Sequence, residues 1–276
     1  MAKNKMHTLK KENSRILKGL AKLDLKKKQQ LLEQLGVDSE HESTLKKLHQ
    51  LLCSEQASSV IQELSCWLIA DIGSKRSTGA LLQAFNDKDD NLSHMAMLAL
   101  AVIKSDKALN FMIETLQRSP NNSKRRSAAY VLQSYFNNER AVDALIYALN
   151  DKAQSPETRA QAAEGLGTLT ATRATNVLVA NLRDPSLEVR AECVWALGQV
   201  GMDAAIIPEL ERFIGDKSKV GIRTIEEEAI EAIRFIKARA IALEKYNGDK
   251  STADVWTIHT ETLDLVEEME KAEAMK

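Results

Sequence analysis

Apolar and polar positions recur along this chain in a helical register. In the copy that begins at Arg159, small or apolar residues follow three, four and seven places later, at Ala162, Ala163 and Leu166. These offsets place the side chains on one stripe of an α-helix. Neighbouring copies lie 31–34 residues apart, and a period of this length indicates stacked repeat units. The anchor positions of the copies are Gln62, Ser93, Arg125, Arg159 and Arg190.

A second helical segment follows each stripe. Residues 80–87, 144–151 and 177–184 superpose without gaps, residues 111–116 fit the same frame, and residues 210–216 fit it more loosely. The pairs Ser155-Pro156 and Asp184-Pro185 place a capping residue before a proline, which is typical of a helix start. No stretch alternates apolar and polar residues with β-branched enrichment, so the pattern predicts helical hairpins and no sheet.

The pattern resembles the HEAT repeat, and more closely its short bacterial form in the phycobilisome-lyase-like group. The resemblance covers residues 56–243, with its best-fitting motifs at residues 158–169 and 184–201. It implies an all-α fold, an α-α superhelix (solenoid) of about five to six helical hairpins with helical caps. Such repeats serve transport, scaffolding, chromophore attachment and nucleic-acid work alike, so the resemblance does not select a function.

The two ends of the chain carry opposite charge. Residues 1–30 hold ten Lys or Arg against Glu12 and Asp24, whereas residues 225–276 are rich in Glu. We therefore expect a basic helical N-terminal cap over residues 1–55, a repeat solenoid over 56–243 and an acidic helical C-terminal extension over 244–276. The basic end has two alternative roles, as a docking arm for an acidic partner, RNA or lipid, and as one half of an end-to-end pairing with the acidic tail.

Composition agrees with a repeat protein that has no global attraction to polyanions. Aromatic residues make up 4% and hydrophobic residues 44%, so the core is built from Leu, Ala, Ile and Val. The formal net charge of −1 favours neither nucleic acid nor an anionic membrane. The longest apolar stretch, residues 95–103, is too short to cross a bilayer, and no secretory signal is recognised. Cys53, Cys66 and Cys193 have no paired spacing, which fits a reducing compartment, and we expect a cytoplasmic protein.

A search for chemistry finds no catalytic constellation, so we expect neither an enzyme nor a bound cofactor. The HEAT-like iron hydroxylases repeat His-Glu pairs in register, but this chain has one such pair, His41-Glu42, and no metal site is expected. Bilin lyases carry aromatic-rich opening repeats, whereas in this chain the main aromatic residues that correspond to that pattern are Trp67 and Trp195. We expect these rings to lie between neighbouring first helices, and keep a lyase-like or accessory subunit that handles a tetrapyrrole as an alternative function.

The polar faces of the second helices are the main candidate site. Repeats present one ridge of side chains per copy along a concave groove, and amides, Tyr and Arg are well suited to protein recognition. We therefore expect a non-enzymatic adaptor or scaffold that binds a protein partner, whose identity the sequence does not give; nucleic-acid binding through the basic N-terminal helices is the other alternative. The candidate partner-binding residues are Gln83, Asn110, Glu114, Asp143, Tyr147, Asn150, Asn176, Arg183 and Arg212.

A lengthened loop is a minor candidate site. Residues 217–223 interrupt the repeat spacing and carry Lys217, Lys219 and Arg223. Thr224 stands three residues before Glu227, which is the spacing of a capping box at a helix start. Extra residues in one copy of a repeat often mark a contact point.

Overall fold

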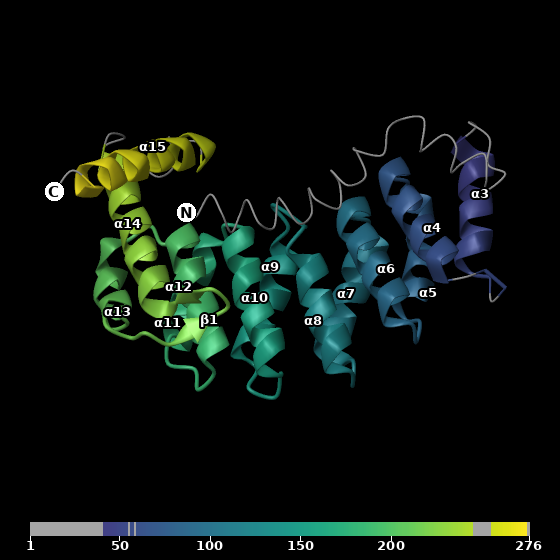
Figure 1. Cartoon of the computed structure of the whole chain (residues 1–276), viewed down its shortest axis with the longest axis horizontal. Coiled ribbons are helices and arrows are strands. Elements are labelled where there is room, and N and C mark those ends of the chain that lie inside the picture. Colours follow the sequence, from purple (N-terminus) through teal and green to yellow (C-terminus); the bar gives the residue numbers. More distant parts are fainter. Residues whose placement is uncertain (1–40, 55, 58, 245–254, 275–276) are drawn as a thin grey trace. The chain divides into compact units, whose positions relative to one another are not determined.

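Figure 1 shows the computed structural model, which describes residues 41–54, 56–57, 59–244 and 255–274. The described residues are almost entirely α-helical and are arranged as successive helical hairpins. The chain divides into two compact units, residues 1–112 and residues 113–276. The basic helices predicted within residues 1–30 lie outside the described residues.

Unit 1 is built around the first helices α4 and α6, which pack against each other. Phe85 is fully buried, and its ring meets the edge of the Phe111 ring, with centroids 6.2 Å apart and planes at 87°. The described elements of this unit are α3 (His41–Leu52), α4 (Ser59–Ile72), η1 (Lys75–Ser77), α5 (Thr78–Phe85), α6 (Asp90–Ile103) and the first part of α7 (Asp106–Arg118).

Unit 2 continues the same alternation of first and second helices, and α15 packs against α14 at its carboxyl end. The predicted boundaries at residues 55 and 243 stay predictions, although α14 ends close to the second of them. After the end of α7, the elements are α8 (Asn122–Leu132), α9 (Glu139–Asn150), α10 (Pro156–Thr168), η2 (Thr172–Ala174), α11 (Thr175–Asn181), α12 (Leu187–Val200), η3 (Ala204–Ile206), α13 (Ile207–Glu211), β1 (Lys219–Val220), β2 (Arg223–Thr224), α14 (Ile225–Glu244) and α15 (Val255–Ala274).

Local sequence explains most helix starts. The Ser155 hydroxyl accepts a hydrogen bond from the backbone N–H of Thr158, and Pro156 occupies the first turn of α10, as predicted. The prediction for α12 was wrong, because its cap is Ser186 and not Asp184. Asp184 lies two residues earlier, where its carboxylate faces a neighbouring repeat and binds the buried Arg159 and the exposed Lys152 instead.

The first helices α8, α10, α12 and α14 pack in a row within unit 2 (Figure 1). Glycines bring their backbones close together. A Cβ added at Gly167 would lie 2.6 Å from the Trp195 ring and 2.9 Å from the Cα of Ala196, and one added at Gly198 would lie 3.0 Å from the Cα of Ala232. Because this layer is so tightly packed, nearly every residue of α10 and α12 is buried or half-buried.

The expectation of no sheet was wrong in one place. At residues 219–224, strands β1 and β2 form a two-residue antiparallel ladder that pairs Lys219 with Thr224 and Val220 with Arg223. Gly221 adopts a φ of 64°, a left-handed conformation that favours glycine and permits the tight turn. The ladder is too short to produce a periodic sequence signal. The predicted capping box is confirmed, since Thr224 and Glu227 exchange hydrogen bonds of 2.8 and 3.2 Å.

Candidate protein-binding surface

All nine predicted partner-binding residues are exposed, and each lies on a second helix or within two residues of its end. Gln83 and Asn110 belong to unit 1 and the other seven to unit 2. Gln83 accepts a long hydrogen bond, 3.5 Å, from the thiol of Cys53. We use the name second-helix surface for the seven members in unit 2, which are Glu114, Asp143, Tyr147, Asn150, Asn176, Arg183 and Arg212.

Repeat register places two members of this surface at equivalent positions of copies that are separated by one further copy. Superposing residues 144–151 on 177–184 matches Tyr147 with Ala180, and the next copy matches Ala180 with Arg212. The Tyr147 side chain is 53% exposed to solvent. The second-helix surface therefore presents an aromatic side chain and a guanidinium in one row, with a small residue between them.

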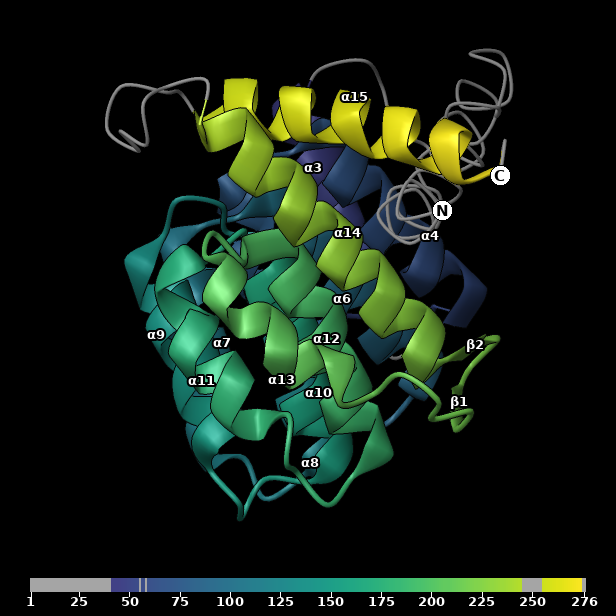
Figure 2. The same ribbon diagram turned by 90° about the vertical axis from the view of Figure 1, so that its left-hand side faces the viewer.

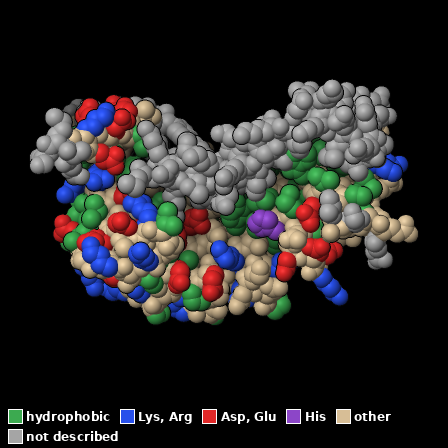
Figure 3. Space-filling view, viewed as in Figure 1, with side chains coloured by type: hydrophobic (Ala, Val, Ile, Leu, Met, Phe, Trp, Pro, Cys, Tyr) green, Lys and Arg blue, Asp and Glu red, His purple; other side chains and the backbone are tan. Residues whose placement is uncertain are grey.

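Charged members of this surface form exposed ion pairs with neighbouring side chains. Arg183 and Arg212 both contact the Glu209 carboxylate, at 3.1 and 2.9 Å, and Asp143 lies 2.7 Å from a nitrogen of Arg173. Such exposed pairs stabilise a fold little, about 0–1 kcal/mol each, so a partner can replace them at small cost. Figure 3, viewed as in Figure 1, shows basic and acidic side chains intermingled also on the opposite face, where the first helices lie.

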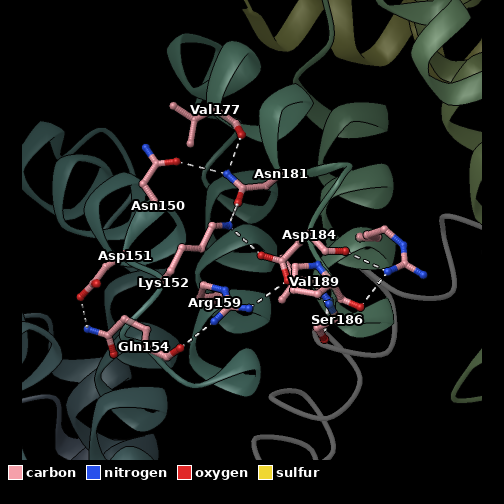
Figure 4. Close-up of polar contacts among 12 residues, drawn as sticks. Asn150, Asp151, Lys152, Gln154, Arg159, Val177, Asn181, Asp184, Ser186 and Val189 are labelled. Carbon is pink, nitrogen blue, oxygen red and sulfur yellow. Dashed lines mark hydrogen bonds and ion pairs between the residues drawn. The ribbon is translucent and has the colours of Figure 1, made fainter.

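A buried polar network joins consecutive repeats, and sequence reasoning missed it (Figure 4). The Asp184 side chain is fully buried and accepts hydrogen bonds from Arg159 Nη2 at 2.9 Å and Lys152 Nζ at 2.7 Å. Burial by itself raises the pKa of Asp184, but hydrogen bonds from Arg159, Lys152 and the Ser186 backbone outweigh it and hold that pKa below its ordinary value. The carboxylate is therefore a structural tie between copies.

One predicted site residue, Asn150, is part of this network. The Asn181 side-chain amide donates to Asn150 Oδ1 at 3.2 Å and to the carbonyl oxygen of Val177 at 2.9 Å, while Lys152 donates to Asn181 Oδ1 at 2.8 Å (Figure 4). Asn150 thus contributes to the contact between α9 and α11 as well as to the exposed surface.

The arginine anchors of the repeat share one structural role. Arg125 donates to the carbonyl oxygen of Ser119 at 2.6 Å, Arg159 to that of Gln154 at 2.6 Å, and Arg190 to that of Asp184 at 2.8 Å. In each copy the guanidinium ties down the loop that precedes its own helix. The recurrence of Arg at the anchor position was the signal that could have revealed this role.

Two tryptophans and two cysteines belong to the core. Trp67 and Trp195 are only 4% and 6% exposed, and the Trp195 ring packs over Gly167 as predicted for contact between first helices. Cys66 and Cys193 are buried, and burial raises the pKa of Cys66 to about 12 and that of Cys193 further. Neither thiol is a reactive thiolate at neutral pH.

The histidines and acidic residues of the described segments form no cluster of three or more metal-ligating side chains. His49 Nε2 lies 2.8 Å from the Ser77 hydroxyl, and burial lowers the pKa of this histidine. The side chains of His41 and Glu42 lie outside the described part of the chain. No helix among the described residues is long and apolar enough to cross a membrane.

The lengthened loop is less basic than its sequence indicates. Lys217 pairs with Glu226, and Arg223 contacts Glu228 at 3.3 Å and Glu231 at 2.5 Å. These carboxylates neutralise the two cations and fix the hairpin on the first turns of α14. The hairpin remains a candidate contact because the Ile222 side chain, between its strands, is 97% exposed.

Comparison with known proteins agrees with this architecture. The family model of HEAT repeats matches residues 45–133, 111–188 and 142–234. No curated protein matches the chain. The phycocyanin lyase complex of CpcE and CpcF from Nostoc sp. PCC7120 is similar in structure, with a TM-score of 0.50 and 18% identity over 84% of this chain and 96% of that one. A designed armadillo repeat protein has a TM-score of 0.40 and 18% identity, covering 70% of this chain and 99% of its own.

Proposed function

Because the chain belongs to the HEAT-repeat family, we propose that it is a non-catalytic adaptor or scaffold that binds a protein partner on its second-helix surface. One observation carries this proposal: the half-exposed Tyr147 lies in register with Arg212, whose guanidinium forms an exposed ion pair with Glu209. Tyr and Arg are the residue types that most often dominate the energetics of protein interfaces.

The different burial of the first and second helices supports the proposal. In unit 2 the first helices α10 and α12 are nearly all buried, and their small residues are used for contact with one another. The second helices α9 and α11 bury one stripe and leave the opposite stripe in solvent. Side chains that do not stabilise the fold are available for recognition, and these lie on the second helices.

Only the similarity of fold supports the alternative of a subunit that handles a tetrapyrrole. In the described residues, both candidate tryptophans and two of the cysteines are buried against the repeat core. Adding bilin or heme to the pure protein and recording its absorbance separates the two functions, since the adaptor leaves the pigment spectrum unchanged. Nucleic-acid binding was assigned to residues 1–30, which the structure does not describe.

Affinity capture tests the proposal. The tagged full chain is used as bait in extract of its native cell, and each captured protein is purified and titrated against the bait. The double substitution Tyr147→Ala and Arg183→Ala should weaken binding by about tenfold or more, as expected when hot-spot residues are removed. Arg126→Ala is the matched control because it removes an exposed arginine from a first helix, α8.

The result that contradicts the proposal is equally clear. If the double variant keeps its circular dichroism spectrum and binds with unchanged affinity, the second-helix surface is not the binding site. Loss of binding in the Arg126→Ala variant would instead place the partner on the first helices.

A further inference from the structure

Among the described residues, α14 is the last first helix, and no further first helix of this part of the chain covers its outward face. At about 100° per residue, Ile230, Arg234, Lys237 and Ile241 fall within an arc of about 60°. Ala232, which the backbone of Gly198 approaches, lies on the opposite side of the helix. Figure 2 shows α14 in front of α12, with α15 crossing near its carboxyl end. We call these four residues the outer face of α14.

Repeat register shows why the row of first helices ends here. A Cβ at Gly167 would meet Ala196 of the next first helix, and a Cβ at Gly198 would meet Ala232 of the one after. Gly198 follows Ala196 by two residues, so the corresponding residue of α14, two places after Ala232, is Arg234. Where two earlier helices have glycine to admit a neighbour, α14 has a long cation. Another small-residue helix cannot pack there at the same distance.

The structure itself shows the kind of helix that this face accepts. Arg234 pairs with Glu270 of α15 at 3.2 Å. Lys237, about one turn along α14, is exposed and has no ion pair among the described residues. Ile230 and Ile241 are 43% and 44% exposed, one on each side of these cations. The exposed part of the face is therefore apolar at both ends and positive in the middle.

Charge order argues against a second copy of the chain as the occupant. Glu227 and Glu244 are exposed and flank the face, so its order is acidic, apolar, basic, basic, apolar, acidic. An antiparallel copy would place Arg234 opposite Lys237 and Glu227 opposite Glu244, and a parallel copy would place each charge opposite itself. Like charges in contact disfavour both arrangements.

We propose that the outer face of α14 docks an amphipathic helix of a partner protein, with a carboxylate facing Lys237 and an apolar residue facing each isoleucine. The two apolar residues of the ligand are three helical turns apart, which matches the separation of Ile230 and Ile241. This surface is separate from the second-helix surface, and the proposal stands without the function assigned to that surface.

A designed peptide tests the proposal with the full chain. The probe is a fluorescein-labelled, lactam-stapled helix with leucines three turns apart and two central glutamates, and its binding is followed by fluorescence anisotropy. The wild-type chain should bind it saturably, and Lys237→Glu should weaken binding by about tenfold because an attraction becomes a repulsion. Lys88→Glu, an exposed lysine in unit 1, is the control for the same change in net charge.

A charge-reversed probe, with lysines in place of the glutamates, completes the test. It should bind the Lys237→Glu variant more tightly than the wild type, and Tyr147→Ala should alter neither result. Equal binding of both probes, absence of saturable binding, or equal losses in the Lys237→Glu and Lys88→Glu variants overturns the proposal. Circular dichroism of Lys237→Glu verifies that the exposed substitution leaves the fold intact.

Discussion

Arg239 of α14 closes the carboxyl end of α12 by donating a 2.5 Å hydrogen bond from Nη1 to the carbonyl oxygen of Gly201. Its Nη2 donates to the carbonyl oxygen of Gly198 at 3.0 Å. Burial lowers the pKa of Arg239 to about 10, so the guanidinium is still protonated at neutral pH. A cation at this position satisfies carbonyls that the helix leaves unpaired and interacts favourably with its dipole.

Replacing this arginine should destabilise unit 2. Arg239→Met keeps most of the apolar stem but leaves two buried carbonyl oxygens without donors, at a cost of about 1–3 kcal/mol. The free energy of unfolding is measured by urea titration followed by circular dichroism. Arg183→Met, which removes an exposed arginine, should change it by less than about 1 kcal/mol. Equal losses in the two variants would contradict the role given to Arg239.

Close approach of the first helices makes Gly167 sensitive to a single methyl group. Gly167→Ala would press a Cβ against the Trp195 ring and the Ala196 backbone, and we expect a loss of about 1–3 kcal/mol from overpacking. Gly79→Ala is the control, because its added Cβ meets only the end of Lys107 at 3.6 Å. That change should be neutral or stabilise by up to about 1 kcal/mol. Similar melting curves for the two variants would rule out the tight contact.

The Asp184 network predicts a specific pH dependence. The folded-state pKa of Asp184 is held below its ordinary value of 3.8, so its contribution is complete above that value and is lost as pH falls through the lower folded pKa. Asp184→Asn should cost about 3–5 kcal/mol at neutral pH, because Arg159 stays buried without a counter-ion. The stability gap to the wild type should narrow only below about pH 4.

The equivalent residue of the next copy provides the comparison for this prediction. Asp216 is half-exposed, and a hydrogen bond from Ser218 lowers its pKa. Asp216→Asn leaves no buried cation behind, so its effect on the free energy of unfolding should be clearly smaller. If the two variants unfold alike from neutral to acidic pH, Asp184 is not the tie between repeats that its contacts indicate.

Thiol labelling distinguishes the exposed cysteine from the buried ones. Burial raises the pKa of all three thiols, but Cys53 is exposed to solvent, whereas Cys66 and Cys193 are buried. Because the thiolate is the reactive form, Ellman's reagent should modify Cys53 alone in the native protein and all three cysteines in denaturant. Cys53→Ser should abolish the native reaction. A rapid reaction that persists in this variant would show that a core thiol is accessible.

Local and periodic features of this protein follow from its sequence alone. The stripe after each anchor determines where the first helices lie, and the period determines that helical hairpins stack. Ser155 before Pro156, and Thr224 three residues before Glu227, specify helix starts because a capping hydrogen bond reaches only two or three residues along the chain. The exposure of the predicted partner-binding residues follows from the same periodicity.

Contacts between repeats were decided by the tertiary structure. The sequence places Asp184 next to Pro185, where a helix cap is the expected role, but the fold brings Arg159 and Lys152 to its carboxylate. Arg234 likewise stands where the two preceding first helices have a glycine, and the fold brings Glu270 of α15 to the Arg234 guanidinium. Periodicity shows which face of a helix is buried, but it does not show which side chain of another repeat lies opposite. That pairing depends on the distance between helices, which side-chain packing sets only once the hairpins have stacked.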